Sequence, residues 1–301
     1  MPLIKANNLD IFYDEFGKRG DPALLLIMGL GTQMIAWPEE FCEDLAGRGF
    51  HVVRFDNRDI GLSQKMKGAP NYSLPLAFAK AWFGWPVRSA YSLDDMAADA
   101  IGLLDALHID RAHIVGASMG GMIAQIIAAK YPQRCLSLTS IMSTSGDRKL
   151  PGPKREAFAS MRMKRPPVTD RDAYVEFGMK VLRSIGSPGF PIPDDELRAF
   201  VTRSYDRSVY PAGFIRQFLA ILANGSRSHL LKTIKMPTLV LHGESDPLVP
   251  VEGGRDTARL IPGAKLKTFA GWGHDLPPQM IPILADAIAE HCKAADARLN
   301  V

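Results

Sequence analysis

Ser118 lies between small residues in the pentapeptide Gly116-Ala117-Ser118-Met119-Gly120, which matches the pattern G-x-S-x-G. A buried-strand pattern precedes this pentapeptide and a helical pattern follows it, so we expect the serine on a sharp turn between the two. On such a turn the hydroxyl is exposed, and the positive end of the helix points to where negative charge develops during acyl transfer. The pattern predicts a serine nucleophile, and the alternative is a glycine-rich turn capped by Ser118.

A serine hydroxyl is a weak nucleophile that needs a base, and the base needs an orienting group. Asp246 follows a predicted strand at Thr238–His242, and His274 follows glycines in Gly271-Trp272-Gly273-His274. Ligands and catalytic groups of open α/β sheets gather outside the carboxyl ends of the strands. The sequence therefore predicts Ser118 as nucleophile, His274 as base and Asp246 as orienting acid.

Two neighbours of the acid compete for these roles: His242 as base and Glu244 as acid. Asp275 follows His274 directly, and its side chain is expected to point away from the imidazole. The other histidines fall on predicted strands or helices or in the insertion described below, where we expect no catalytic role: His51, His108, His113, His229 and His291.

Strand and helix patterns alternate through the first half of the chain. Leu3–Ala6 and Leu9–Phe16 predict a hairpin. Further strands are predicted at Ala23–Met28, His51–Phe55, Ala112–Val115 and Leu136–Met142, and helices at Glu39–Arg48, Leu93–Leu107 and Met119–Lys130. Alternation of this kind favours a mostly parallel sheet with helices on both faces.

From Asp147 to about Lys235 the strand patterns disappear, and prolines separate helical pieces such as Asp170–Leu182 and Asp194–Tyr205. The alternation then resumes, with strands at Thr238–His242 and Lys265–Phe269 and helices at Gly253–Leu260 and Ile281–Lys293. We therefore expect a core of residues 1–146 and 236–301, interrupted by a helical cap of residues 147–235.

Composition narrows the class of protein. The 301 residues carry 36 Lys and Arg against 32 Asp and Glu, and 47% are hydrophobic, which predicts an ordinary globular protein without a basic patch for nucleic acid. The three cysteines match no zinc or disulfide spacing, and no signal peptide or membrane span is recognisable. We expect a cytoplasmic protein with reduced cysteines. The sequence indicates no oligomeric state.

The chain resembles serine hydrolases of the α/β-hydrolase fold. The resemblance rests on Gly116–Gly120, on Ser245-Asp246-Pro247-Leu248-Val249-Pro250, on Gly271–His274 and on Asp56-Asn57-Arg58-Asp59-Ile60-Gly61-Leu62-Ser63. In the last of these, Asp59 stands where glycine is common. The resemblance implies an eight-stranded sheet and no metal or organic cofactor. The segment from Met28 to Phe41 is similar to the aclacinomycin-methylesterase-like branch of carboxylesterases.

The resemblance also implies an oxyanion hole formed by the backbone N–H groups of Leu30 and Met119. Many members have histidine before the glycine that follows the third strand, whereas this chain has Met28-Gly29. The hole itself needs only the N–H groups. Because the histidine also supplies a hydrogen bond, its loss raises the question of what keeps this loop rigid.

The expected reaction is hydrolysis of a small-molecule carboxylic ester through an acyl-enzyme intermediate. Aromatic and apolar residues near the motifs predict a pocket for hydrophobic short- to medium-chain or bulky esters. Its predicted walls are Gly29, Trp37, Phe83, Met142, Phe214, Leu248 and Trp272, with Trp82 and Trp85 as further candidates. The aromatic stretch Phe78–Trp85 is expected to be a second lid piece, a partner surface or core.

Related reactions remain open from the sequence. A serine triad on this fold also serves C–C bond hydrolases, lactonases, amidases, peptidases and cofactor-free haloperoxidases. A ligand receptor with slow turnover is the alternative outside the enzymes.

Overall fold

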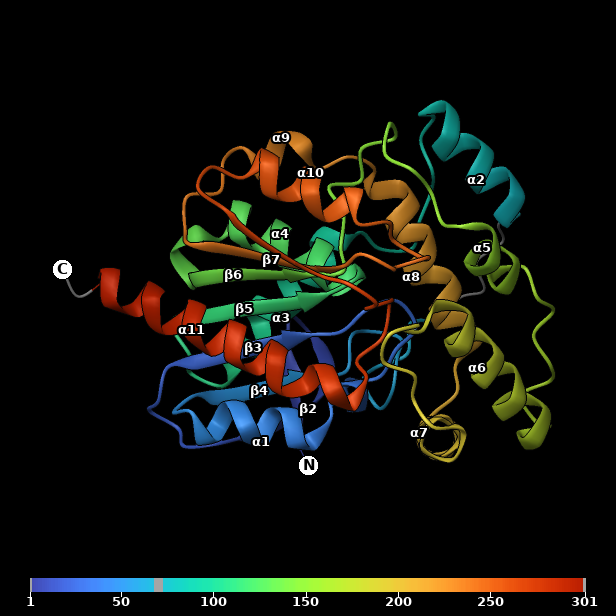
Figure 1. Cartoon of the computed structure of the whole chain (residues 1–301), viewed down its shortest axis with the longest axis horizontal. Helices are drawn as coiled ribbons and strands as arrows, with labels where there is room; N and C mark the ends of the chain where they lie inside the picture. The colour runs from blue at the N-terminus through green and yellow to red at the C-terminus, as the bar shows by residue number, and fades with distance from the viewer. Residues whose placement is uncertain (1, 68–72, 300–301) are drawn as a thin grey trace.

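A computed structural model describes residues 2–67 and 73–299. Within these ranges an eight-stranded sheet has the order β1-β2-β4-β3-β5-β6-β7-β8 (Figure 1). The pairs β1–β2 and β2–β4 are antiparallel, and every later pair is parallel. The predicted mostly parallel α/β sheet is confirmed.

The predicted strands agree with the observed ones to within two residues at each end. The strands are β1 (Leu3–Ala6), β2 (Leu9–Phe16), β3 (Ala23–Ile27), β4 (His51–Phe55), β5 (Ala112–Ala117), β6 (Cys135–Ile141), β7 (Thr238–Gly243) and β8 (Lys265–Phe269). The predicted hairpin is confirmed as well. Asn7 and Asn8 form its turn with φ values of 47° and 63°, a conformation that asparagine tolerates better than most residues.

Helices cover both faces of the sheet. The side chains of β3 divide between them: Leu24 and Leu26 pack with α1 (Glu39–Gly47) and α11 (Ile281–Leu299). Leu25 and Ile27 pack with helices of the other face. These are α3 (Leu93–Ala106), α4 (Met119–Lys130) and α10 (Glu252–Leu260). A continuous apolar strand is therefore buried on both sides, as its sequence predicts.

The start of α3 shows how sequence sets a helix boundary. Ser92 Oγ accepts a hydrogen bond from the Asp95 N–H (3.1 Å), and the Asp95 carboxylate accepts one from the Ser92 N–H (2.7 Å). This reciprocal pair is a capping box, which satisfies two backbone donors and fixes the first turn.

The segment between β6 and β7 is helical where the structure describes it. It contains α5 (Arg155–Met161), α6 (Arg171–Ile185), α7 (Asp194–Arg207), α8 (Pro211–Asn224) and α9 (Ser228–Leu231). The two helical pieces that have predicted bounds correspond to α6 and α7, which extend two to three residues further, and α5, α8 and α9 are the pieces without predicted bounds. In Figure 1 the arrowheads of β5, β6 and β7 point toward the side where α6, α7 and α8 lie.

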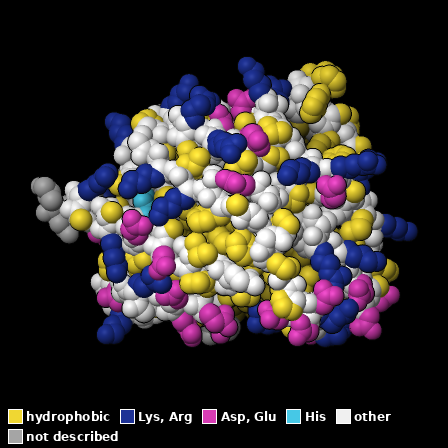
Figure 2. All heavy atoms as spheres, viewed as in Figure 1, with side chains coloured by type: hydrophobic (Ala, Val, Ile, Leu, Met, Phe, Trp, Pro, Cys, Tyr) yellow, Lys and Arg dark blue, Asp and Glu magenta, His cyan; other side chains and the backbone are white. Residues whose placement is uncertain are grey.

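A further helix, α2 (Leu74–Phe83), occupies the aromatic stretch between β4 and α3. It ends at Gly84, which has a φ of 74° that suits glycine. The side chains of Trp82, Phe83 and Trp85 are 78%, 64% and 61% exposed, so the expectation of core is wrong for them. Figure 2 shows hydrophobic side chains gathered at the upper right, where Figure 1 places α2.

The three cysteines, Cys42, Cys135 and Cys292, are free and buried, and burial raises the pKa of each thiol to about 12. They are packing residues. In the described ranges, no helix combines the length and the apolar character needed to cross a bilayer.

Candidate active site

Ser118 lies on the predicted sharp turn between β5 and α4. Its φ is 57° and its ψ is −119°, a strained conformation for a residue with a side chain. The strain is held by three hydrogen bonds: Ser118 N–H donates to Ile141 O (2.9 Å), and Ser118 O accepts from Ser143 Oγ (2.8 Å) and Met122 N–H (3.2 Å).

The glycines of the pentapeptide are required by close backbone contacts. A Cβ on Gly116 would lie 2.1 Å from Gly120 O, and a Cβ on Gly120 would lie 2.0 Å from Ile27 O. Both distances are far below van der Waals contact. The turn therefore brings β5, α4 and the end of β3 so close together that side chains at these two positions are excluded.

His274 joins the other two predicted triad residues. Its Nε2 lies 3.0 Å from Ser118 Oγ and its Nδ1 lies 2.7 Å from Asp246 Oδ2. An ionised carboxylate can only accept, so Nδ1 carries the proton and Nε2 is free to accept the serine proton. All three side chains follow the carboxyl ends of strands: β5 for Ser118, β7 for Asp246 and β8 for His274.

The Asp246 carboxylate is almost wholly buried and has partners on both oxygens. Its Oδ1 accepts hydrogen bonds from the backbone N–H groups of Leu248 (2.9 Å) and Val249 (2.8 Å). Burial opposes ionisation of Asp246, but the electrostatic interaction with the His274 imidazole and the hydrogen bonds outweigh it and hold the pKa well below its usual range. A permanently ionised carboxylate stabilises the imidazolium that forms when His274 takes a proton.

The rival residues lie nearby but contact other groups. His242 Nε2 donates to Val249 O (2.7 Å) and is 3.5 Å from Asp246 Oδ2, so His242 supports the acid loop. Glu244 accepts a hydrogen bond from Thr268 Oγ1 (2.8 Å) on β8. Asp275 accepts hydrogen bonds from the side chain and backbone of Ser187 and so turns away from the imidazole, as expected.

The loop after β3 brings the predicted oxyanion donors to the serine. A Cβ on Gly29 would lie 3.0 Å from Ser118 Cβ and 3.5 Å from Ser118 Oγ, so the loop contacts the nucleophile directly. Within the described part of the chain, the N–H groups of Leu30 and Met119 donate no hydrogen bond to protein. Both are therefore available for a negatively charged oxygen.

In this loop Met28 occupies the position where histidine is common. Two side-chain amides, those of Asn57 and Gln217, form hydrogen bonds to the backbone of the loop. Asn57 Nδ2 donates to Met28 O (2.9 Å), and Gln217 Oε1 accepts from Gly31 N–H (2.9 Å). Gln217 is fully buried on α8, and its Nε2 donates to Arg58 O (2.9 Å). The loop is thus fixed from both sides without an imidazole.

The loop that carries His274 is held by the end of α6. His274 N–H donates to Ile185 O (2.7 Å), and Gly273 N–H donates to Ser187 Oγ (2.8 Å). Burial raises the pKa of Asp275, and the hydrogen bonds from Ser187, which lower it, only partly offset this effect. The helical segment between β6 and β7 therefore supports both the histidine loop and the loop after β3.

The predicted pocket residues fall into different environments. Phe214 lies beside the loop after β3, because a Cβ on Gly31 would collide with its ring. Leu248 is half-buried in the acid loop. Met142 is buried just after β6. These three, with Gly29, remain predicted pocket residues.

Three predicted wall positions need correction. Trp37 stacks on Phe41 with ring centroids 5.5 Å apart, and Trp272 donates its indole N–H to Asp275 O; both are wholly buried in the core with α1 and α11. Phe83 lies on the outer surface of α2. Trp82 and Trp85 lie outside with it, because the aromatic stretch folds as a surface helix.

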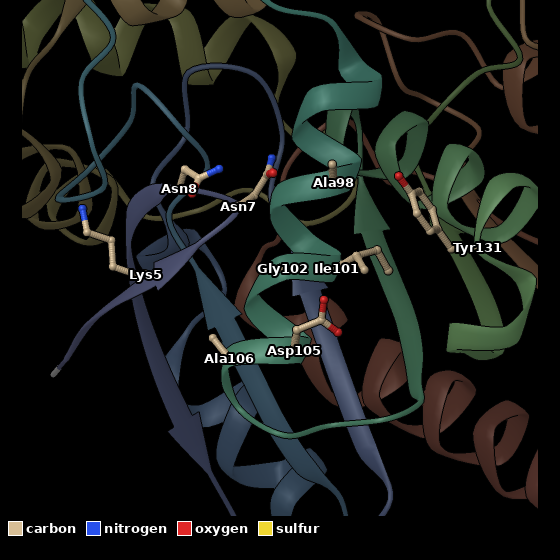
Figure 3. A pocket seen from close by; sticks show the side chains of 9 residues that line it. All are labelled: Lys5, Asn7, Asn8, Ala98, Ile101, Gly102, Asp105, Ala106 and Tyr131. Atoms are coloured by element: carbon tan, nitrogen blue, oxygen red, sulfur yellow. The ribbon is translucent and has the colours of Figure 1, made fainter.

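A separate open depression of about 630 Å³ is lined by none of these residues (Figure 3). Lys5, Asn7 and Asn8 line it from the first hairpin, Tyr131 lines it from the end of α4, and the remaining lining residues belong to α3. No triad residue lines this depression, so it is not the space in which a substrate of Ser118 would bind. Residues 2–67 and 73–299 also contain no group of three or more His, Cys, Asp and Glu side chains placed to hold a metal ion.

Residues 22–278 match the family model described as alpha/beta hydrolase fold, and the chain belongs to this family. The fold and the hydrogen-bonded arrangement of Ser118, His274 and Asp246 thus define a hydrolase. The chain is similar to the rhodomycin D methylesterase DauP of Streptomyces sp. (strain C5), with 29% identity over 320 aligned positions covering 97% of this chain and 98% of that protein.

Two other similarities are broader. The putative carbamate hydrolase RutD of Pantoea ananatis (strain LMG 20103) is 28% identical over 290 positions, 92% of each chain. The solved structure of a meta-cleavage product hydrolase from Pseudomonas fluorescens IP01 superposes with a TM-score of 0.74 at 21% identity, covering 98% of each chain. The last similarity concerns the fold alone.

Sequence reasoning missed the residues that support the site. Gln217, Ile185 and Ser187 lie in the helical segment between β6 and β7 and contact loops far away in the chain. Ile185 acts through its carbonyl, which no side-chain pattern marks. For Gln217 the only available signal is a polar residue within the apolar run of α8.

Proposed function

We propose that this protein is a serine esterase that hydrolyses carboxylic esters through an acyl-enzyme intermediate. The observation that carries the proposal is the pair of hydrogen bonds made by His274, at 3.0 Å to Ser118 Oγ and 2.7 Å to Asp246 Oδ2. These distances satisfy the geometry of a nucleophile, a base and an orienting acid.

In the first half-reaction Ser118 Oγ attacks the ester carbonyl carbon while His274 Nε2 takes the hydroxyl proton. The carbonyl oxygen becomes negative and accepts hydrogen bonds from the N–H groups of Leu30 and Met119. The tetrahedral intermediate then expels the alcohol, which receives the proton from His274. Loss of one such N–H donor typically costs about 3 kcal/mol of transition-state stabilisation.

In the second half-reaction water attacks the acyl carbon. His274 takes a proton from the water, the tetrahedral intermediate collapses, and Ser118 Oγ leaves with that proton. The products are the free acid and the regenerated enzyme. Asp246 holds the imidazole in one tautomer throughout and stabilises its positive charge.

The similarity to a methylesterase over nearly the whole chain supports a methyl or other small alkyl ester as the substrate class. Phe214 supports a hydrophobic acyl group, because its ring offers an apolar surface against Gly31 of the loop after β3. We further propose that residues 147–235 form a cap over the core of residues 1–146 and 236–301, since α6 contacts the loop of His274 and α8 contacts the loop after β3.

A fluorophosphonate probe followed by peptide mapping tests the nucleophile. We expect the label on Ser118 and no label in Ser118→Ala, and a label elsewhere would contradict the proposal. A panel of methyl esters, carbamates, amides and vinylogous 1,5-diketones tests the reaction class, with ester turnover expected to be fastest. A single acylation without turnover on every substrate would instead indicate a receptor.

A further inference from the structure

The surface of α2 is unusually apolar for a helix that faces solvent. Ala77 is buried and Phe78 contacts Phe218 of α8 with ring centroids 5.4 Å apart, so the helix is attached along one side. Of the other large side chains, Leu76, Trp82 and Phe83 on α2 and Trp85 just after it are exposed, and Phe78 itself is still 42% exposed. Contiguous exposed apolar side chains of this size mark a binding surface, because solvent-facing helices are normally polar.

Positive charge is concentrated in the segment that contains α2 and in the segment that leads into and out of α5. Residues 73–90 and 147–165 together contain nine Lys and Arg against two acidic residues, a net charge of +7, whereas the whole chain has +4. The rest of the chain is therefore net negative. The nine are Lys80, Arg88, Arg148, Lys149, Lys154, Arg155, Arg162, Lys164 and Arg165.

These cations also lack the ion pairs that arginines form elsewhere on the surface. Arg171 pairs with Asp206, Arg198 with Glu176 and Arg134 with Asp105. Within residues 2–67 and 73–299, none of the nine forms an ion pair with a carboxylate. Two of them lie over aromatic rings instead, Arg162 over Phe158 and Arg165 over Phe214.

The two segments form one continuous surface, which we call the α2–α5 surface. The Arg148 guanidinium lies against Gly84 at the end of α2, where a Cβ would collide with it. On α5 the exposed ring of Phe158 lies 5.7 Å from the Arg162 guanidinium. Figure 1 places α2 and α5 at the same side, and Figure 2 shows hydrophobic and basic side chains along that side.

We propose that the α2–α5 surface docks the protein onto an anionic phospholipid membrane. Tryptophan and phenylalanine enter the interface between headgroups and acyl chains, and Lys and Arg bind the lipid phosphates. The absence of compensating carboxylates favours a polyanionic partner over a second copy, because a symmetric contact between two copies would oppose +7 to +7. Exposed Leu76 on the same helix favours a bilayer over a nucleic acid, because bases stack on aromatic rings but provide no apolar interior for an aliphatic side chain.

Docking through this surface places the membrane near the active site. Phe78 contacts Phe218, Phe218 stacks on Phe214 at 6.3 Å, and the Phe214 ring lies against Gly31 of the loop after β3. Apolar side chains therefore form a continuous row from the docked helix to the edge of the active site. This inference concerns attachment and does not depend on the proposed reaction.

Co-sedimentation of the full chain with vesicles tests the proposal. We expect binding to vesicles of phosphatidylcholine and phosphatidylglycerol at 3:1, at least tenfold weaker binding to pure phosphatidylcholine, and weakening in 500 mM NaCl. Trp82→Ser/Phe83→Ser/Trp85→Ser and Lys154→Glu/Arg155→Glu/Lys164→Glu are each expected to reduce binding at least tenfold.

Matched controls alter exposed residues elsewhere by the same chemistry. Leu3→Ser/Ile283→Ser removes exposed apolar side chains, and Lys18→Glu/Lys232→Glu/Lys293→Glu makes the same change in net charge. Both are expected to bind like the wild type, and circular dichroism checks that every variant folds. Absence of binding to the anionic vesicles, or equal loss in controls and surface variants, would overturn the proposal. Two further results would overturn it. One is self-association that competes with vesicle binding and is lost in the tryptophan variant, and the other is binding to a single-stranded oligonucleotide with the same two properties.

Discussion

Gln217 on α8 accepts a hydrogen bond from the N–H of Gly31, 186 residues earlier in the chain, at 2.9 Å. Its amide nitrogen donates to Arg58 O at the same distance. Through these contacts a buried side chain from the proposed cap fixes the loop that carries the Leu30 N–H. Gln217 is thus a positioning residue for the proposed oxyanion hole.

Gln217→Met keeps the size of the side chain but removes both hydrogen bonds. We expect kcat for a methyl ester to fall about 10- to 100-fold with little change in KM, because a misplaced oxyanion donor weakens the transition state selectively. Gln64→Met is the control, since Gln64 Oε1 accepts from the Asp10 N–H (3.1 Å) away from the site. A change in KM alone, or an equal effect in both variants, would contradict the positioning role of Gln217.

His274→Ala and Ser118→Ala should each lower kcat by about 10⁴-fold or more, and the double variant should lose little beyond that, because triad residues act as a unit. Steady-state rates of the three variants test this. His242→Ala is the comparison: His242 supports the same acid through Val249 O, so we expect a loss of several-fold only. A collapse in His242→Ala would move the base to that residue.

Asp59→Gly restores the residue that is common in the resembling family and relieves a φ of 73°. Asp59 nevertheless forms a buried ion pair with Arg216 (2.7 Å) and accepts from Tyr91 Oη (2.8 Å). Removing one member of a buried ion pair typically costs about 3 to 5 kcal/mol, more than the relieved strain. Urea unfolding should therefore show Asp59→Gly less stable, with partial recovery in Asp59→Gly/Arg216→Met.

His291 on α11 donates its Nε2–H to Leu138 O (3.2 Å), and burial lowers its pKa from 6.5 to about 4. The unfolded chain then binds a proton between these two pH values that the folded chain does not. Stability from this group is complete above pH 6.5 and is lost as the pH falls toward 4, by up to roughly 3 kcal/mol.

His291→Gln should reduce this loss of unfolding free energy between pH 7 and pH 4.5, as measured by urea titration at several pH values. Exposed His229→Gln is the control and should leave the pH dependence unchanged. An unaltered slope in His291→Gln would assign the pH dependence to other groups.

Much of the architecture could be predicted because its signals are local. The apolar run of β3 and the capping residues of α3 can each be recognised from a few consecutive residues. The positions of Ser118, Asp246 and His274 follow from motifs at strand ends, which the parallel sheet brings to one edge.

The remainder depends on contacts that the sequence does not mark. Aromatic composition places Phe83 near the site, but which side of α2 faces solvent is decided by packing of Phe78 on α8. Trp37 follows the loop after β3, yet it turns into the core because Phe41 one helical turn later stacks on it. The role of Gln217 depends on the path of a whole helical segment across the molecule.

The backbone link between Ile185 and His274, together with the link between Gln217 and Gly31, has a consequence for protein engineering. Grafting this segment from one relative into another would transplant part of the catalytic scaffold along with any selectivity it confers. A chimera whose donor lacks an amide at position 217 should have a misplaced loop after β3. One whose graft shifts the carbonyl at position 185 should have a misplaced His274 imidazole. Substrate range and turnover are therefore expected to change together when such segments are exchanged.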